Sequence, residues 1–461
     1  MNNKIVILGA GISGLTTAYL LNKDGYDVTV LEKKNEVGGS IETVFDKGYL
    51  FDRGPNSGLE TTPLIEQIVN DLKLSDQFVY ANRKGNKRYI LRNDVLHPLP
   101  MNPKSFLKSR LFSSRGKFRL FAELFIGRSK DGYYQSIGEF VKRRLGQEFL
   151  DYAINPFVAG VYAGNPEDLS VKSAFPKLYA LEEKYGGLIK GTIKSIKERK
   201  NRPEKSKQDA KMFSFNDGMQ VFPLAISEFL GEKVHLNSEV NSVETVQSGY
   251  KINYSNSGGL SSVDCNYLIS TIPAYTASTL FGRFDSFLAE HLNKIYYPPV
   301  LVLFIAYDIK DIGQPLDGFG FLIPAKEKKS FLGAIWSSVL FPNRAGEGQA
   351  SFTLFIGGAR DPGVLTYDKD LLIKRVRNEF ETLMRIVGEP IYLTYKFWPK
   401  AIPQYNLGYI EHENYFDKFE KDNPGILLSG NYREGISVGD CIKNSEKILN
   451  KIKKLSNKEG V

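Results

Sequence analysis

Three glycines near the N-terminus have a spacing that suits the binding of a diphosphate. Gly9, Gly11 and Gly14 form the pattern GxGxxG, and Glu32 follows the third glycine by 18 residues. In a dinucleotide site the first glycine permits a tight turn, the second lets the backbone approach the pyrophosphate, and the third lets a helix pack closely on a strand. A carboxylate at Glu32 accepts hydrogen bonds from a ribose 2′-hydroxyl, which disfavours a 2′-phosphate and therefore NADP.

The segments around these glycines have the pattern of a strand, a helix and a second strand. Residues 4–8 (KIVIL) are apolar and rich in β-branched side chains, residues 15–21 continue as a helix, and residues 27–31 (DVTVL) end directly before the acid. Such a β-α-β unit brings the free N–H groups and the positive dipole end of the helix to the phosphates. An ordinary glycine turn is the alternative, but the strand, helix and acid in their required places favour the dinucleotide site.

Further glycine-rich segments favour FAD over NAD. Gly38 and Gly39 follow the acid closely, as in many FAD enzymes, and residues 51–56 (FDRGPN) predict a tight loop against an extended cofactor. Residues 425–430 (GILLSG) predict a core strand, followed by a glycine-rich loop and a helix to about Leu455. The positive end of that helix suits the negative charge that develops on the N1/C2 side of a reduced flavin, although a plain loop is the alternative.

Length and composition restrict the class of protein. A chain of 461 residues is too long for one core, so we expect two domains and a third lobe. Cys265 and Cys441 are far apart and the four histidines are scattered, which argues against a disulfide framework or a metal site. We expect no signal peptide before the strand at Lys4, and the longest apolar run, residues 300–307, is much shorter than the ~20 residues of a spanning helix.

The net charge of +9 is unevenly distributed. Residues 190–211 carry nine Lys or Arg against three acids and predict an exposed or disordered basic loop. Residues 104–130 interleave aromatic and aliphatic side chains with basic ones, a pattern typical of helices on an anionic membrane surface. The alternative is an apolar face in the core with a solvated basic face. Nucleic-acid binding is disfavoured, because no recognition motif accompanies the charge.

Six internal blocks add more specific information. They are HPLP (97–100), AGVYAGN (159–165), GFGFLIP (318–324), SSVLFPNRA (337–345), IGGA (356–359) and IPQY (402–405). Together with the glycine motifs, these blocks resemble the protoporphyrinogen oxidase family, and the resemblance covers residues 4–450. The N-terminal motif alone indicates only a flavoprotein of the amine-oxidase superfamily.

The resemblance implies an α/β fold with a discontinuous Rossmann-type FAD-binding domain. We expect residues 1–85, 212–275 and 396–461 to form that domain. Residues 86–100 and 276–395 would form a substrate-binding domain on a mixed sheet. Residues 101–211 would form a helical lobe that associates with a membrane surface.

The FAD is expected to bind noncovalently, because residues 395–403 (YKFWPKAIP) lack the cysteine that attaches flavin in some amine oxidases. In the family, the backbone at the position of Val240 meets the adenine. The residues expected to bind FAD are Gly9, Gly11, Ile12, Ser13, Gly14, Glu32, Lys33, Gly38, Gly39, Ser40, Gly54, Pro55, Asn56, Val240, Thr271, Trp398, Gly430, Gly435, Ser437 and Val438.

The resemblance implies oxidation of protoporphyrinogen IX to protoporphyrin IX in haem biosynthesis, a six-electron oxidation with O2 as acceptor. By resemblance, Leu322, Leu332 and Phe355 would sandwich the macrocycle. Arg88 would pair with a propionate, for which a guanidinium is well shaped, and the carbonyl of Gly160 would lie near the pyrrole N–H groups. Without the resemblance, these apolar residues would indicate a core and Arg88 a surface arginine. No side chain is assigned as a general base.

Two other activities stay open. A coproporphyrinogen III oxidase has the same fold and chemistry, and its substrate carries two more propionates. Arg88 and residues 337–345 look more like the protoporphyrinogen-type enzymes, whereas the basic surface also suits extra carboxylates. An FAD-dependent amine oxidase is the second alternative, but residues 299–304 (PVLVLF) lack the lysine that many amine oxidases place near the flavin N5. A non-enzymatic flavin scaffold has no positive support in the sequence.

The expected partners follow from this reading. They are the porphyrinogen substrate, molecular oxygen, a membrane surface and a ferrochelatase. The ferrochelatase is expected as the enzyme that receives the product, because free porphyrins are phototoxic. We expect no nucleic-acid partner. The expected location is cytoplasmic and peripheral, on the inner face of the cell membrane.

Overall fold

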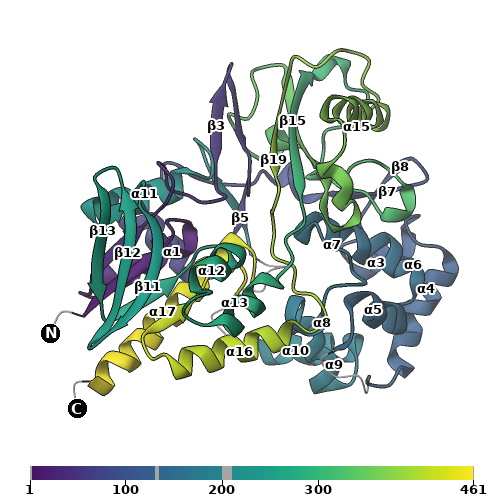
Figure 1. Cartoon of the computed structure of the whole chain (residues 1–461). Helices are drawn as coiled ribbons and strands as arrows, with labels where there is room; N and C mark the ends of the chain where they lie inside the picture. The colour runs from purple at the N-terminus through teal and green to yellow at the C-terminus, as the bar shows by residue number, and fades with distance from the viewer. Residues whose placement is uncertain (1–2, 130–133, 200–209, 460–461) are drawn as a thin grey trace.

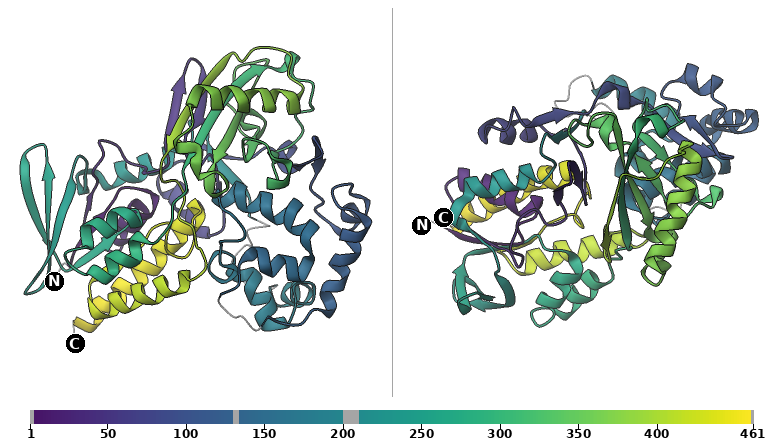
Figure 2. Two further views of the ribbon diagram at one scale, coloured as in Figure 1. Left: turned by 45° about the vertical axis from the view of Figure 1, so that its right-hand side comes forward. Right: turned by 90° about the horizontal axis from the view of Figure 1, so that it is seen from above.

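The computed structural model describes residues 3–129, 134–199 and 210–459 of the chain. In Figure 1 the two chain ends lie close together, beside strands and helices that come from the beginning, middle and end of the sequence. A second sheet stands above them, and a lobe made of helices lies at the lower right. The turned views in Figure 2 show the same three parts, with the helical lobe on the far side from the chain ends.

A five-stranded parallel sheet carries the glycine motif. In spatial order its strands are β10 (Val234–His235), β2 (Asp27–Leu31), β1 (Lys4–Leu8), β14 (Tyr267–Ser270) and β20 (Ile426–Leu428). Strands β1, β14 and β20 are buried over nearly their whole length, which explains why they are apolar throughout instead of alternating. The sheet joins segments that are distant in sequence, as the resemblance implied for the discontinuous α/β part.

Helices cover this sheet. The predicted β-α-β unit is confirmed, because α1 (Ile12–Lys23) connects β1 to β2. α1 packs beside α17 (Val438–Glu459) and α11 (Val221–Leu230), and α2 (Pro63–Asp71) contacts α17. The first ten residues of α1 are all buried, so this helix shows no amphipathic pattern.

Three antiparallel strands form a separate meander beside the parallel sheet. They are β11 (Glu239–Val246), β12 (Gly249–Asn256) and β13 (Gly259–Cys265). Val240, expected to meet the adenine, therefore lies on the first strand of this meander. Three helices pack nearby, namely α12 (Ala274–Phe281), α13 (Ser286–Asn293) and α16 (Tyr409–Asp422).

A seven-stranded mixed sheet forms the second layered part. In spatial order its strands are β19 (Tyr392–Trp398), β15 (Val300–Asp308), β18 (Gln349–Gly357), β17 (Gly333–Ile335), β16 (Gly320–Leu322), β7 (Arg88–Arg92) and β8 (Val95–Pro98). Only β16 and β7 pair in parallel. One face of the sheet packs on α15 (Lys369–Met384), where Leu303 and Ile305 join a core with Phe380. The opposite face of the sheet lies towards the rest of the molecule.

Short strands and a short helix connect the two sheets. They are β3 (Thr43–Asp46), β4 (Tyr49–Asp52), β5 (Gly58–Leu59), β6 (Phe78–Tyr80), β9 (Met212–Phe215) and α14 (Ser337–Leu340). The predicted loop over residues 51–56 is therefore too long at its start. Phe51 and Asp52 belong to β4, because they pair with Val44 and Thr43 of β3.

The helical lobe is formed by residues between β8 and β9. Its helices are α3 (Pro103–Lys108), α4 (Ser114–Phe121), η2 (Ala122–Phe125), α5 (Ile137–Leu145), α6 (Gln147–Phe149), η4 (Leu150–Ile154), α7 (Asn155–Tyr162), α8 (Val171–Ala174), α9 (Pro176–Tyr185) and α10 (Leu188–Arg199). None of the helices in the described part of the chain has the length and apolar character needed to cross a membrane.

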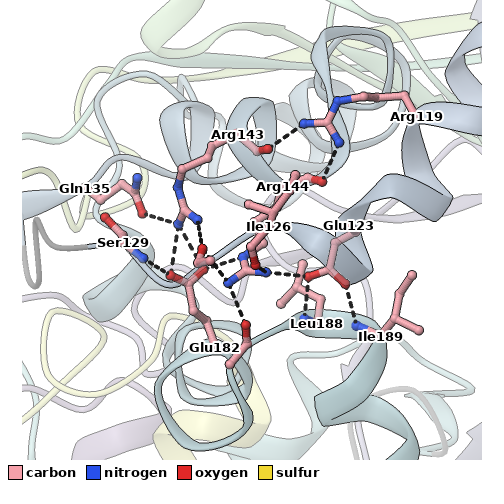
Figure 3. Close-up of polar contacts among 12 residues, drawn as sticks. Arg119, Glu123, Ile126, Ser129, Gln135, Arg143, Arg144, Glu182, Leu188 and Ile189 are labelled. Atoms are coloured by element: carbon pink, nitrogen blue, oxygen red, sulfur yellow. Dashed lines mark hydrogen bonds and ion pairs between the residues drawn. The ribbon is translucent and has the colours of Figure 1, made fainter.

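A buried arginine organises the centre of this lobe (Figure 3). The fully buried guanidinium of Arg144 donates to the carboxylates of Glu123, at 2.8 Å, and Glu182, at 2.6 Å. It also donates to the carbonyl oxygens of Ile126, Gly127 and Gly186. A buried charge is tolerated only with such partners, so this one side chain connects η2, α5 and α9.

The expected basic loop over residues 190–211 is wrong for its first half, which belongs to α10. The carboxylate of Glu123 accepts the N–H groups of Leu188 and Ile189, at 2.7 and 3.2 Å. An acidic side chain at a helix N-terminus satisfies free N–H groups and interacts favourably with the helix dipole. Residues 200–209 of the expected loop lie outside the described residues.

Candidate active site

The glycine motif forms the turn between β1 and α1. Gly9 has φ +95°, a left-handed conformation that favours glycine. Gly11 is the N-cap residue of α1, and no side chain caps this helix. A Cβ at Gly14 would lie 2.0 Å from the carbonyl oxygen of Gly9, so only glycine permits this approach of helix and turn. The first N–H groups of α1, on Ile12 and Ser13, are thus available to an anion.

The second glycine pair packs directly on the first motif. The N–H of Gly38 donates to Ala10 O at 2.9 Å, and Gly38 forms a bridge with Gly11. Gly39 has φ +66°, and a Cβ there would lie 3.2 Å from the Cα of Gly11. Residues without side chains therefore face one another across the turn, which leaves the backbone open to a large ligand. Ser40 follows directly and is exposed.

Glu32 is fixed at the end of β2. Its Oε2 accepts the N–H of Ala10 at 2.7 Å, and its Oε1 accepts the N–H of Lys34 at 2.9 Å. Each carboxylate oxygen has a second acceptor site for a ribose hydroxyl. The neighbouring Lys33 forms an ion pair with Glu239 at 2.7 Å, next to Val240. The structure thus places the three residues expected at the adenosine end of the cofactor, Glu32, Lys33 and Val240, close together.

The loop before α17 reaches the same edge of the parallel sheet. Gly430 and Gly435 have φ +113° and +141°. Ser437 accepts the N–H of Asp440 at 3.2 Å and donates to its carboxylate at 2.6 Å, so it caps the helix that begins at Val438. Because α1 and α17 both follow parallel strands, their positive dipole ends lie at the carboxyl edge of the sheet, where ligands bind in open α/β folds.

Trp398 and Gly54 hold the loop that follows β4. The indole N–H of Trp398 donates to the carbonyl of Arg53 at 2.8 Å. A Cβ at Gly54 would lie 1.8 Å from the carbonyl oxygen of Ser40. The loop formed by residues 54–56 therefore lies between the segment that contains Gly38, Gly39 and Ser40 and the end of β19. Thr271 serves the turn itself, because its hydroxyl donates to Leu8 O at 2.7 Å.

Sequence reasoning missed an ionic cluster beside this loop. The carboxylate of Glu42 pairs with Arg53 at 2.7 Å and with Lys396 at 3.2 Å. Burial would raise the pKa of Glu42, but hydrogen bonds from the two cations lower it overall. No local signal could have found this cluster, because Lys396 of β19 is far in the sequence from Glu42 and Arg53, which flank the β3–β4 hairpin.

The expected substrate residues lie on the face of the mixed sheet that is opposite to α15. Paired residues share a face, and the register runs from Val302 through Phe355 and Gly333 to Leu322. Leu332 and Val302 belong to a buried cluster, against which Phe355 and Trp398 pack. The structure therefore connects the apolar substrate residues to a residue that holds the loop at 53–56.

Helix α7 covers part of this face. A Cβ at Gly160 would lie 2.5 Å from a methyl carbon of Leu322, so glycine lets α7 approach β16. Ala159 and Ala163 of the same segment belong to the buried cluster of Leu332. Small residues on α7 thus set the distance between the helical lobe and the mixed sheet.

Arg88 stands at the far end of the same face. It is paired with Gly320, two residues before the pair of Ile90 and Leu322, and residues two apart on a strand share a face. Its side chain is exposed, and its guanidinium lies 5.4 Å from the ring centre of Phe319. Among the described residues no carboxylate pairs with Arg88, whereas the neighbouring Lys87 pairs with Asp317.

These residues fit an extended flavin dinucleotide. Glu32 and Val240 are placed for the adenosine, the glycine turn for the diphosphate, and the start of α17 with Trp398 for the ring system. Within the described residues, no three His, Cys, Asp or Glu side chains gather as metal ligands would.

Comparison with known proteins agrees with this fold. Residues 12–446 match the family model described as flavin containing amine oxidoreductase, and the chain belongs to that family. It is 34% identical to protoporphyrinogen oxidase 2 of Arabidopsis thaliana, over 95% of this chain and 91% of the relative. It is 28% identical to coproporphyrinogen III oxidase of Bacillus subtilis, over 95% of each chain. Within the family, the chain is an FAD-dependent oxidoreductase of the porphyrinogen oxidase group.

Solved structures show the same architecture. A putative protoporphyrinogen oxidase from Exiguobacterium superposes with a TM-score of 0.79 at 20% identity, covering 98% of this chain and 99% of that one. A reduced UDP-galactopyranose mutase superposes with a TM-score of 0.74 at 18% identity, covering 99% and 94%. The α/β fold with a parallel Rossmann-like sheet and a mixed sheet is therefore shared across this group.

Proposed function

We propose that this chain oxidises protoporphyrinogen IX to protoporphyrin IX with molecular oxygen as acceptor. The observation that carries the proposal is the position of Arg88 at one end of an apolar sheet face that reaches Trp398 at the other. A porphyrinogen has an apolar body and an acidic edge, and such a face with one terminal cation suits both. The bound flavin would supply the acceptor for a hydride.

The chain's own residues bind and orient the substrate in this proposal. Leu322, Leu332 and Phe355 offer the apolar surface and exclude water from it. Arg88 fixes the acidic edge, which determines the part of the macrocycle that lies at Trp398 and the loop beyond it. A bidentate contact between guanidinium and carboxylate gives this orientation more specificity than a point charge would.

The choice of protoporphyrinogen over coproporphyrinogen III rests on the charges near Arg88. Coproporphyrinogen III carries four propionates, and a site for it needs additional cations. Near this end of the sheet Lys87 pairs with Asp317, Arg92 with Glu148 and Lys326 with Asp151. These cations already have carboxylate partners within the chain, so Arg88 suits the single acidic edge of protoporphyrinogen.

The first experiment gives the purified protein each porphyrinogen separately, at matched low concentrations, and follows the growth of porphyrin fluorescence. A higher kcat/KM for protoporphyrinogen IX supports the proposal. A higher kcat/KM for coproporphyrinogen III overturns the substrate assignment. The flavin is expected to leave the protein on acid denaturation, and flavin that stays attached would contradict noncovalent binding.

The helical lobe carries a surface that fits an anionic membrane. Phe118 and Phe125 are 77% and 90% exposed, and other exposed apolar side chains lie on α3, α4 and η2. They are Leu107, Phe121 and Leu124. Basic residues such as Lys108 and Arg115 alternate with them, as in helices that lie in a membrane interface. We propose that this surface places the protein peripherally on the inner face of the cell membrane, near a ferrochelatase that takes the product.

Vesicle sedimentation tests the membrane proposal. The protein should bind vesicles that contain phosphatidylglycerol more strongly than vesicles of phosphatidylcholine alone. The double variant Phe118→Asp and Phe125→Asp should lose this binding, whereas Phe287→Asp, a change at an exposed phenylalanine of α13, should not. Equal binding by both variants would refute the proposal.

A further inference from the structure

Arg344 is a buried cation that the proposed site does not use. It lies in the SSVLFPNRA block, between α14 and β18 of the mixed sheet, and its side chain is 3% exposed. Its guanidinium donates to the carbonyl oxygens of Phe215 at 3.1 Å and of Asn216 and Pro342 at 3.2 Å, and to Ser214 Oγ at 3.1 Å. The side chain of Arg344, which lies in the loop before β18, therefore contacts β9 and the turn that follows β9.

The same guanidinium faces Asp52, the last residue of β4. Nη2 of Arg344 lies 3.9 Å from Oδ2 of Asp52, whose side chain is 1% exposed. Oδ1 of Asp52 accepts the Thr43 hydroxyl at 2.5 Å and the Met219 N–H at 2.9 Å. Among the described residues no group donates a hydrogen bond to Oδ2. The positive charge of the Arg344 guanidinium thus compensates the negative charge at Oδ2 of Asp52.

Asp52 leads directly into the loop expected to contact the flavin. Arg53 follows it and is held by Trp398, and Gly54 follows Arg53. Asn56 lines a small cavity together with Asp52 and Arg344. The cavity, of about 10 Å³, also meets the buried hydroxyl pair of Ser337 and Thr353, 2.9 Å apart. A buried polar layer thus lies beside residues 54–56, with members from β4, from α14 and the loop after it, and from β18 of the mixed sheet.

We propose that Arg344 is a positioning residue, which holds the Asp52 carboxylate and thereby fixes residues 54–56 against the flavin. The inference rests on the proposed FAD site. It also gives the SSVLFPNRA block a role, because this block places the Arg344 cation between the mixed sheet and residues 54–56.

The physical reason is the cost of leaving a buried charge without its partner. Removing Arg344 alone leaves the carboxylate of Asp52 in a low-dielectric interior, where it must recruit water or a proton by local rearrangement. Burial already raises the pKa of Asp52, and the Arg344 charge is the largest influence that opposes this rise. Residues 54–56, two to four positions away, would take up the rearrangement.

The test compares Arg344→Gln with the double variant Asp52→Asn/Arg344→Gln, using the full chain reconstituted with FAD. Arg344→Gln should weaken FAD binding at least about tenfold, which corresponds to about 1.4 kcal/mol, and should shift the visible spectrum of the bound flavin. The double variant should recover most of both, because it removes the unbalanced carboxylate. A contact that served the fold alone would leave the visible spectrum of the bound flavin unchanged in Arg344→Gln.

Two further variants make the test decisive. Arg344→Lys keeps the charge but loses most of the fork of hydrogen bonds, so it should keep FAD affinity better than Arg344→Gln even if Arg344→Gln folds poorly. Arg377→Gln removes a partly buried arginine of α15 that pairs with Glu381 and Glu389, and it should leave the flavin unchanged.

The outcomes separate this inference from the proposed function. Wild-type FAD affinity and spectrum in folded Arg344→Gln, or no recovery in the double variant, would overturn the role of Arg344 alone. Absence of FAD binding by the wild type would overturn the proposed function and this inference with it. A preference of the wild type for coproporphyrinogen III would overturn the substrate assignment alone. The expected effects of the Arg344 variants on FAD binding would be unchanged.

Discussion

The Nδ1 atoms of His291 and His412 lie 2.9 Å apart and join α13 to α16. Two of the four histidines, which are distant in the sequence, thus form one contact. The ring of His291 stacks on Tyr415, with centres 4.5 Å apart, and Tyr409 meets His412 edge-on. One ring nitrogen must donate and the other accept, so the contact requires at least one neutral imidazole.

Acid should therefore weaken the fold at this contact. Burial, and next the charge of His291, lower the pKa of His412 to about 4. Burial and the charge of Lys294 also lower the pKa of His291, while Glu290, Glu411 and Asp285 oppose this. In the unfolded chain a histidine binds its proton near pH 6.5, earlier than in the folded one. The contribution is thus complete above pH 6.5 and is lost as the pH falls towards 4.

Urea unfolding at pH 7.5, 6.5 and 5.5 checks this prediction. The free energy of unfolding should fall by at most about 1.4 kcal/mol per pH unit from this group, and His412→Gln should flatten the slope. His235→Gln, at an exposed histidine of β10, is the matched control and should keep the wild-type slope. Equal slopes in the wild type and in His412→Gln would contradict the prediction.

Gly14→Ala should abolish FAD binding. The new Cβ would lie 2.0 Å from a backbone oxygen and 2.7 Å from the hydroxyl of Thr271, so α1 must move away from the turn. Gly127→Ala is the control, since a Cβ at Gly127 meets no atom within 4 Å. The flavin content of the purified variants gives the answer, and retained flavin in Gly14→Ala would refute the close approach.

The sequence allowed prediction of those parts that depend on local pattern. The β-α-β unit and the core strand before α17 each follow from apolar runs and glycine positions within a few residues. Their confirmation reflects short-range physics, in which β-branched runs form buried strands and glycines permit tight turns. The family resemblance then supplied the expectation that distant segments form one α/β fold.

Contacts between distant segments could not be predicted in this way. The pairing of Arg344 with Asp52 joins the loop between α14 and β18 to the end of β4, and no local pattern at either residue indicates the other. The expected basic loop failed for the same reason. Its first half is helical, and at the start of that helix Glu123, far away in the sequence, accepts the N–H groups of Leu188 and Ile189.

Arg88→Ala should raise the KM for the porphyrinogen about tenfold or more and leave FAD content unchanged. A charge-assisted hydrogen bond contributes about 1.5–3 kcal/mol, and the exposure of Arg88 places its effect at the lower end. Lys87→Ala is the matched control, because its partner Asp317 belongs to the chain. Steady-state kinetics with both variants decide the matter, and an unchanged KM in Arg88→Ala would remove the carboxylate contact from the proposal.

Arg144→Met should destabilise the helical lobe more than any single change on its surface. Removing one partner of a buried ion pair typically costs about 3–5 kcal/mol, because the carboxylate of Glu123 would stay buried without a cation and Glu182 would keep only Arg143. Burial alone would raise the pKa of Glu182, but hydrogen bonds from Arg144 and its neighbours lower it, so the carboxylate is charged at neutral pH. Glu123 lies in the same short helix as Phe125, so the exposed apolar surface should loosen as well.

Thermal unfolding and vesicle binding should therefore change together in Arg144→Met. The midpoint of unfolding should fall by several degrees, and binding to vesicles with phosphatidylglycerol should weaken. Lys294→Ala removes a solvent-exposed pair with Glu290, which contributes little to stability, and should change neither. If Arg144→Met lost stability but bound vesicles like the wild type, the buried network would support the fold of the lobe without holding the surface around Phe125.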